Sequence, residues 1–513
     1  MQARRFDAAT RGQSKRAAGA FALALVLSLG CMSVVNPVTG EREYTTMSPQ
    51  QEVQIGKQAA AEVEQQLGFI DNARLQVYIA QLGGRLAQHS PRQDVKYEFH
   101  GVDMEATNAF ALPGGYVYIS RGLLALANSE DELAGVLGHE IGHVAARHSA
   151  QRQTRGQLAG IGAAIATLGA AVLGGGPLAE SVAQIAQTGA QGWLASYSRD
   201  QELQSDNIGQ QLAAQAGYDP SAIGDFLAAL GREEEVRTGE KRQATFLDSH
   251  PTSDERVRKA KARAASLTPA AAAPIAHDRS DFVRRSEGIL VGPDPAQGVF
   301  RDNLFLHPDL DFAVRFPRGW QTQNSPEAVL AKPEQGNALI ALLAVPKSEG
   351  ADARSAARKM LNDAAQQNVP AEDGGSVRVG ALRGYRVRAA AQGQLLERTY
   401  FMHGGGVFAF QVMSLQNEFD DWSDAFDKTL QSFRTLSSDD RAQITETRLA
   451  LVPAKAGETL AQVASRSNNS WSAAETALYN GLRGDEKLST GFLVKVGRER
   501  PYVARAGAAA AGE

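Results

Sequence analysis

The stretch that decides the predicted fold is Glu132-Leu-Ala-Gly-Val-Leu-Gly-His-Glu-Ile-Gly-His143. Ser129 just ahead of it and the helical spacing of its apolar residues predict a helix. On that helix His139 and His143 lie about 40° apart on one face and can grip one zinc ion. Two imidazoles leave positions for a third protein ligand and a water. Glu140 lies alongside, where it can take a proton from that water and pass it to a leaving amine.

The third metal ligand lies outside this motif. His148 falls on the opposite face of the helix from His139, so we reject it as a ligand. Downstream, Glu202 and Asp206 are four residues apart on an expected helix and share a face. One carboxylate can bind zinc while the other accepts the second ring N–H of a ligating histidine, although two acids at this spacing also suit an ordinary exposed helix.

A wider pattern extends over residues 51–265. Its segments are Glu52-Val-Gln-Ile-Gly-Lys57, Asn108-Ala-Phe-Ala-Leu-Pro-Gly-Gly115, the stretch 132–143, and Ser198-Arg199 with Glu202 and Asp206. Together they resemble the HtpX/BepA-type zinc metallopeptidases of family M48. The resemblance implies a mainly α zincin-type metalloprotease domain with a small β-sheet. It maps the third zinc ligand to Glu202 and the carboxylate that orients a ligating histidine to Asp206. Gln204-Ser205 departs from the Glu-Ala that the family usually has.

A histidine near the end of this region has two possible roles. Similar family members carry a His-Pro close to the zinc, and His250-Pro251 stands at that place. A histidine in an open coordination position would displace the water and act as a gate. Alternatively His250 would stabilise the oxyanion, a role for which Tyr197 and Arg199 are further candidates, or it would be an ordinary loop residue.

Local patterns predict the other elements of this region. Residues 51–66 and 72–86 have helical spacing, and residues 97–103 are expected to form a strand. The stretch Tyr116-Val117-Tyr118-Ile119-Ser120 is rich in β-forming residues and predicts a second strand. By the family resemblance this second strand borders the cleft, where an extended peptide could add as a further strand.

Composition bounds the remaining possibilities. The chain has 513 residues, enough for about three domains. Hydrophobic residues make up 43% and charged residues 21%, which excludes a disordered, collagenous or polytopic membrane protein. The net charge is −4 and no motif combines basic and aromatic residues, so no nucleic-acid partner is expected.

The N-terminus has the pattern of an export signal, which we assign to residues 1–31. Five basic residues and one acidic residue in the first twenty precede a short apolar run, 17–32. Ser28-Leu-Gly-Cys31 resembles a bacterial lipobox, with serine where leucine is usual, so Cys31 is a candidate for lipidation. The alternative is an ordinary signal peptide. Cys31 is the only cysteine, so the chain forms no internal disulfide.

Changes in amino-acid composition along the chain predict the domain boundaries. A Pro/Ala-rich linker at 264–278 separates a metalloprotease domain (45–265) from an α+β accessory domain (279–438). The uncharged segment 156–179 is expected to be a helical hairpin beside the active site, because a single membrane span there would separate His143 from Glu202.

The C-terminal residues 448–502 resemble a LysM module, a small βααβ unit that binds N-acetylglucosamine-containing glycans such as peptidoglycan. Trp471 and Tyr479 could stack on sugar faces or form a small core.

These patterns predict a multidomain, periplasmic zinc endopeptidase with one zinc ion per chain. It would cleave misfolded or unassembled cell-envelope proteins, with an outer-membrane lipid anchor and peptidoglycan as possible further contacts. The rival hypothesis is a cell-wall-associated chaperone or assembly factor with an inhibited metal site. The intact Glu140 argues against vestigial chemistry.

Overall fold

The computed structural model describes residues 32–156, 197–236, 246–250, 254–325 and 328–504. The described residues form two compact units. One runs to Val291 and includes Leu449–Arg498, and the other consists of Gly292–Arg448 and the residues from Glu499 onward. Residues 1–31, with Cys31, and nearly all of the expected 156–179 hairpin lie outside the described residues. Within the described ranges, no helix is long and apolar enough to cross a membrane.

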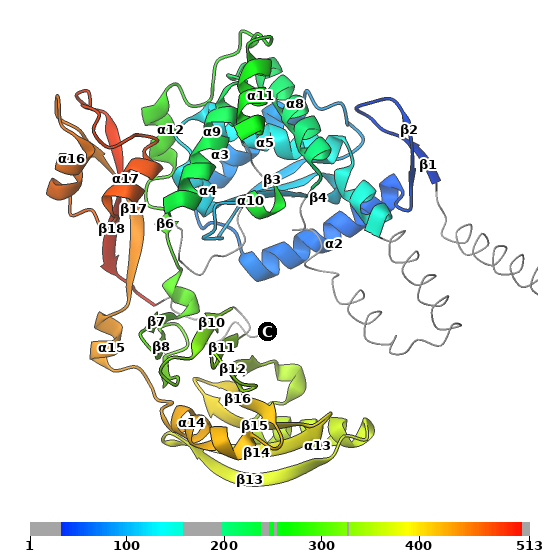
Figure 1. Cartoon of the computed structure of the whole chain (residues 1–513), viewed down its shortest axis with the longest axis vertical. Coiled ribbons are helices and arrows are strands. Elements are labelled where there is room, and N and C mark those ends of the chain that lie inside the picture. Colours follow the sequence, from blue (N-terminus) through cyan, green and yellow to red (C-terminus); the bar gives the residue numbers. More distant parts are fainter. Residues whose placement is uncertain (1–31, 157–196, 237–245, 251–253, 326–327, 505–513) are drawn as a thin grey trace, which may run out of the picture. The chain divides into compact units, whose positions relative to one another are not determined.

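A three-stranded sheet organises the first unit. Its order is β3 (Glu98–Val102), β5 (Tyr116–Ser120) and β4 (Ala109–Leu112), with β3 parallel and β4 antiparallel to β5. Figure 1 shows helix α2 (Pro49–Leu67) on one side of this sheet and α3 (Ala73–Ala87) on the other. The expected strands at 97–103 and 116–120 and the expected helices at 51–66 and 72–86 are therefore present.

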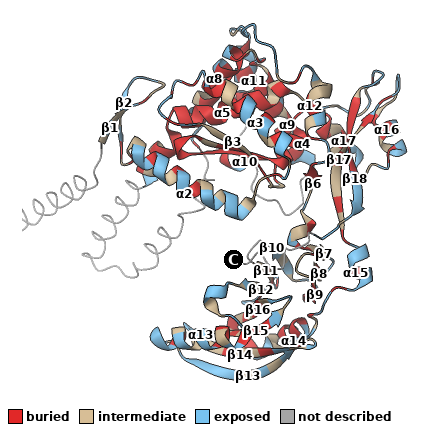
Figure 2. Ribbon diagram, turned by 180° about the vertical axis from the view of Figure 1, so that it is seen from behind, coloured by how far each residue is buried: buried red, intermediate tan, exposed pale blue. Residues whose placement is uncertain are grey.

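The other elements complete this helical unit. They are β1 (Met32–Val35), β2 (Arg42–Thr45), α4 (Arg121–Leu126), α5 (Glu130–Ala145), α8 (Arg199–Gln215), α9 (Ala222–Val236), α10 (Phe246–Ser249), α11 (Asp254–Ala264), α12 (Arg279–Arg285) and β6 (Leu290–Val291). The predicted helix start at Ser129 is confirmed, because its side chain accepts a hydrogen bond from the Glu132 amide. Figure 2 shows α5 buried along its length, so the core of the unit surrounds the stretch 132–143.

The C-terminal region has the expected order of one strand, two helices and one strand. These are β17 (Thr445–Pro453), α16 (Leu460–Arg466), α17 (Ala473–Tyr479) and β18 (Leu493–Pro501). Residues 449–498 belong to the first unit, and Tyr479 and Leu493 lie in the same hydrophobic core as α5. The Trp471 ring stacks on Tyr479 at 4.5 Å, and Tyr479 is only 4% exposed, which favours the core role for that ring.

The second unit is built on a seven-stranded antiparallel sheet. Its order is β10 (Gln321–Asn324), β11 (Ala328–Lys332), β12 (Leu339–Val345), β16 (Gly406–Leu415), β15 (Gln394–His403), β14 (Leu382–Ala391) and β13 (Ala371–Val379). Helix α13 (Ala353–Gln366) packs on one face and α14 (Phe419–Gln431) on the other. A smaller sheet holds β7 (Val299–Arg301), β8 (Leu304–His307) and β9 (Phe312–Arg315). The sequence-based expectation of an α+β unit here is confirmed.

Candidate metal centre

The predicted ligands lie on helices α5 and α8, whose backbones pass very close to each other. A Cβ atom added at Gly138 would lie 2.8 Å from the carbonyl oxygen of Gly209. A Cβ atom added at Gly209 would lie 2.6 Å from the amide nitrogen of His139. Any larger residue would force the helices apart. The two glycines therefore let the carboxylates of α8 reach the imidazoles of α5.

Four buried side chains meet at this crossing: His139, His143, Glu202 and His250. The Nε2 atoms of His139 and His143 are 3.0 Å apart, and Glu202 Oε1 is 3.4 Å from His143 Nε2. Nδ1 of His250 lies 3.1 Å from His139 Nε2 and 3.0 Å from Glu202 Oε1. Atoms bound at about 2.0–2.1 Å to a tetrahedral zinc ion lie roughly 3.3 Å apart. The four donors therefore have the chemistry and spacing of a zinc site.

Glu140 faces the same centre and has no bonded partner there. Both of its carboxylate oxygens are buried without a hydrogen-bond partner among the described residues. Nε2 of His250 lies 3.6 Å from Glu140 Oε1. Burial raises the pKa of Glu140, which brings a carboxylate closer to the range useful for proton transfer at neutral pH. An unpaired buried carboxylate beside a metal site suits a group that handles a water molecule.

Asp206 and Arg256 hold the ligands in place. Asp206 Oδ1 accepts the Nδ1 proton of His139 at 2.9 Å, as the sequence predicts for Asp206. Arg256 on α11 contacts Asp206 Oδ2 at 2.7 Å and Glu202 Oε2 at 2.7 Å. Burial alone would raise the pKa of Asp206, but the hydrogen bonds from Arg256 and His139 lower it overall.

Arg256 is not among the site residues that the sequence predicts. It lies in the charged run Asp254–Ala264, where one more arginine carries no distinguishing signal.

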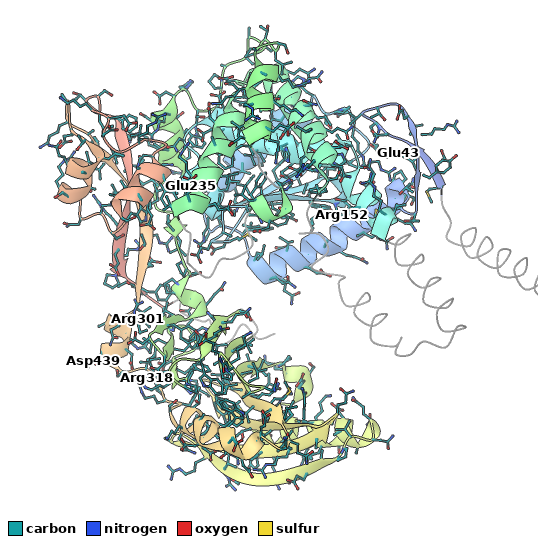
Figure 3. The ribbon with its side chains drawn as sticks, in the orientation of Figure 1. Glu43, Arg152, Glu235, Arg301, Arg318 and Asp439 are labelled. Carbon is teal, nitrogen blue, oxygen red and sulfur yellow. The ribbon has the colours of Figure 1, made fainter. Side chains whose placement is uncertain are left out.

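Tyr197 and Arg199, the further candidates for stabilising the oxyanion, differ in burial and in distance from the cluster. Tyr197 is buried, and its ring stacks on His143 at 3.9 Å. The Tyr197 hydroxyl lies 3.3 Å from Ser149 Oγ, and Arg152, labelled in Figure 3, lies over the ring with its Cζ atom 4.6 Å from the centroid. Arg199 is exposed at the start of α8 and does not belong to the buried cluster.

The strand expected to receive the substrate needs correction. Residues Tyr116, Val117 and Tyr118 belong to β5, which pairs with β3 on one side and β4 on the other. Because both sides of β5 are already hydrogen-bonded, an extended peptide cannot add to it. The sheet has its edges at β3 and β4, and on the outer side of β3 the Ile70 amide already donates to the Gly101 carbonyl.

Three of the four clustered residues, His139, His143 and Glu202, lie in the part of the chain that matches a known protein family. The model of peptidase family M48 matches residues 73–264. The chain is 30% identical over 235 residues to the beta-barrel assembly-enhancing protease of Yersinia pestis, covering 45% of this chain and 48% of that protein. It is 31% identical over 228 residues to the mitochondrial metalloendopeptidase OMA1 of Schizosaccharomyces pombe, covering 44% and 64%. The chain thus spans about half the length of the first of these relatives and somewhat more of the second.

Proposed function

We propose that this chain is a zinc-dependent endopeptidase, because the model of peptidase family M48 matches residues 73–264. His139, His143 and Glu202 would hold the metal. The observation that carries the proposal is the near-tetrahedral spacing of their buried donor atoms. Bound zinc would supply a Lewis acid that polarises the scissile carbonyl and lowers the pKa of water.

Glu140, Asp206 and Arg256 would have separate roles beside the metal ligands. Glu140 would take a proton from the attacking water and deliver it to the leaving amine, because it is a buried carboxylate whose oxygens accept no hydrogen bond from the part of the chain that the structure describes. Asp206 keeps the proton of His139 on Nδ1, which leaves the Nε2 lone pair free for the metal. Arg256 occupies Oε2 of Glu202 and so leaves Oε1 toward the ligand cluster.

His250 would act as a gate in the resting protein. Its Nδ1 stands in the fourth donor position, and its Nε2 faces Glu140. A water serving both the metal and Glu140 would need the same place, so His250 must move before substrate is cleaved. His250→Ala should therefore raise basal proteolysis while zinc stays bound. If His250 instead stabilised the oxyanion, the same change would lower turnover by roughly 10²–10³-fold.

The substrates we propose are misfolded or unassembled proteins of the cell envelope. Several relatives are named beta-barrel assembly-enhancing proteases, which supports this substrate class. The basic and apolar residues at 1–31 support export to the periplasm, with Cys31 as the site of an outer-membrane lipid anchor. Residues 448–502 would add contact with peptidoglycan.

One experiment tests the enzymatic proposal. Purified protein is analysed for zinc and incubated with an unfolded outer-membrane protein, alongside Glu140→Gln. We expect one zinc per chain in both proteins and degradation only by the wild type. The occupied fourth donor position supports a second candidate function, a chaperone with a permanently inhibited metal site. Wild-type and His250→Ala proteins that bind zinc but cleave nothing, yet suppress aggregation of the substrate, would favour that candidate.

A further inference from the structure

His148 is buried beside the metal centre but has no role in the proposed reaction. Its side chain is fully shielded from solvent. Its Nδ1 lies 2.9 Å from Nδ1 of His143, and its Nε2 lies 2.9 Å from Oε1 of Gln204. A helical projection from α5 places His148 on the wrong face, but α5 ends at Ala145. Arg147 has a φ of 57°, and this left-handed residue redirects the chain so that His148 returns to His143.

The direction of each hydrogen bond follows from the chemistry of its atoms. The amide oxygen of Gln204 can only accept, so Nε2 of His148 carries a proton. With Nε2 donating to Gln204, Nδ1 is the acceptor atom of the His148 ring, and it lies 2.9 Å from Nδ1 of His143 and 3.3 Å from Oγ of Ser205. His143 then donates from its own Nδ1. This arrangement leaves the Nε2 lone pair of His143 toward the other donor atoms of the metal site.

We propose that His148 is a positioning residue that fixes the tautomer and ring orientation of the zinc ligand His143. This inference rests on the proposed zinc-dependent function. The two metal-binding imidazoles of α5 would then be oriented by different acceptors, His139 by the Asp206 carboxylate and His143 by a neutral imidazole. Partners of this kind, which bond the far nitrogen of a ligating histidine, influence metal affinity without touching the metal.

Two variants of similar shape separate this role from simple packing. Asparagine at 148 can place an amide oxygen near the position of the imidazole Nδ1 and so preserve the acceptor for His143. Leucine has nearly the same size and branching but offers no acceptor. Both variants lose the ring and the bond to Gln204. If His148 only filled space, the two changes would weaken zinc binding equally.

The measurement is zinc affinity of the full chain, by competition with a chromophoric chelator. We expect His148→Leu to bind zinc about 10–100-fold more weakly than wild type, and His148→Asn to recover most of that loss. Melting temperatures of the metal-free proteins report on any loss of folding. His307→Leu, a change in the second unit, is the control and should leave zinc affinity unaltered.

The outcomes distinguish failure of this inference from failure of the proposed function. A wild type that binds zinc, with His148→Leu binding it equally tightly, would overturn the role of His148 alone. So would a His148→Asn variant as weak as His148→Leu. A wild-type chain with no affinity for zinc would overturn the proposed function and the positioning role together.

Discussion

Replacing Arg256 with methionine should destabilise the metal-free protein strongly. The guanidinium contacts Glu202 at 2.7 Å and Asp206 at 2.7 and 2.8 Å, and all three side chains are at most 5% exposed. Removing one partner of a buried ion pair typically costs about 3–5 kcal/mol, because the other charge stays buried. Here two carboxylates lose a partner, but His139 and His250 remain beside them. We therefore expect a loss near the lower end, about 3 kcal/mol.

The assay is urea unfolding of the metal-free proteins, with Arg258→Met as the matched control. Arg258 lies on the same helix but is exposed, so its replacement should change the free energy of unfolding by no more than about 0.5 kcal/mol. The effect of Arg256 should also depend on pH. The folded pKa of Asp206 is lowered, so its stabilising contribution is present above its unfolded pKa of about 3.9 and is lost as pH falls further. The gap between wild type and Arg256→Met should narrow over the same acidic range.

Two results would refute this reasoning. One is a loss for Arg256→Met no larger than that of Arg258→Met, which would mean that the buried pairs give no net stabilisation. The other is a loss that stays constant as the carboxylates are protonated. In that case the effect would come from lost packing of the arginine stem, and the ion pairs with Glu202 and Asp206 would not be its cause.

Three further changes test other parts of the structure. Glu202→Ala should lose bound zinc by metal analysis, whereas His148→Ala should keep one zinc per chain at saturating metal, because only Glu202 is in the ligand set; the reverse result would contradict the assignment. Burial lowers the pKa of His307 to about 4, and its Nδ1 accepts the Leu310 amide proton. The contribution of His307 to the free energy of unfolding should therefore be fully present above about pH 6.5 and fall by at most about 3 kcal/mol as pH drops toward 4. In urea unfolding, His307→Asn should remove this pH dependence. An equal pH dependence in the variant would exclude His307 as its cause. Lys495 is buried and donates to the carbonyls of Ala125 and Ala127. Lys495→Met should therefore lower the free energy of unfolding by about 1–3 kcal/mol, while Lys487→Met, at an exposed position, should leave it almost unchanged. Equal effects of the two changes would show that the buried contacts contribute little.

Local elements of the fold could be predicted from the sequence because their signals are local. The β-forming residues of 116–120 and the helical spacing of 51–66 depend only on near neighbours. The central place of β5 in its sheet could not be predicted, because strand order depends on which distant segments pair. The inclusion of residues 449–498 in the first unit could not be predicted for the same reason. It rests on contacts such as Lys495 with the end of α4, which join residues more than 360 positions apart.

The candidate metal site shows the same division between local and distant information. His139 and His143 follow from a four-residue spacing on one helix, and Glu202 with Asp206 from the same spacing on another. The assignment of Glu202 as the ligand needed the family resemblance. The place of His148 was missed because helical geometry was extended past the end of α5, where Arg147 adopts a left-handed conformation.

Hydrogen bonds and one ion pair within the centre distinguish the candidate metal ligands from Glu140, the proposed base. His139 is tied to Asp206, His143 to His148, and Glu202 to Arg256. Each of these contacts removes a degree of freedom from a metal ligand, as a preorganised site requires. Glu140 is equally buried, but neither of its carboxylate oxygens accepts a hydrogen bond from the described residues, and its contact with His250 Nε2 is 3.6 Å long. A buried carboxylate without hydrogen bonds is an unfavourable feature that packing does not require. Proton transfer requires it, because a carboxylate already occupied by strong donors would be a poor base.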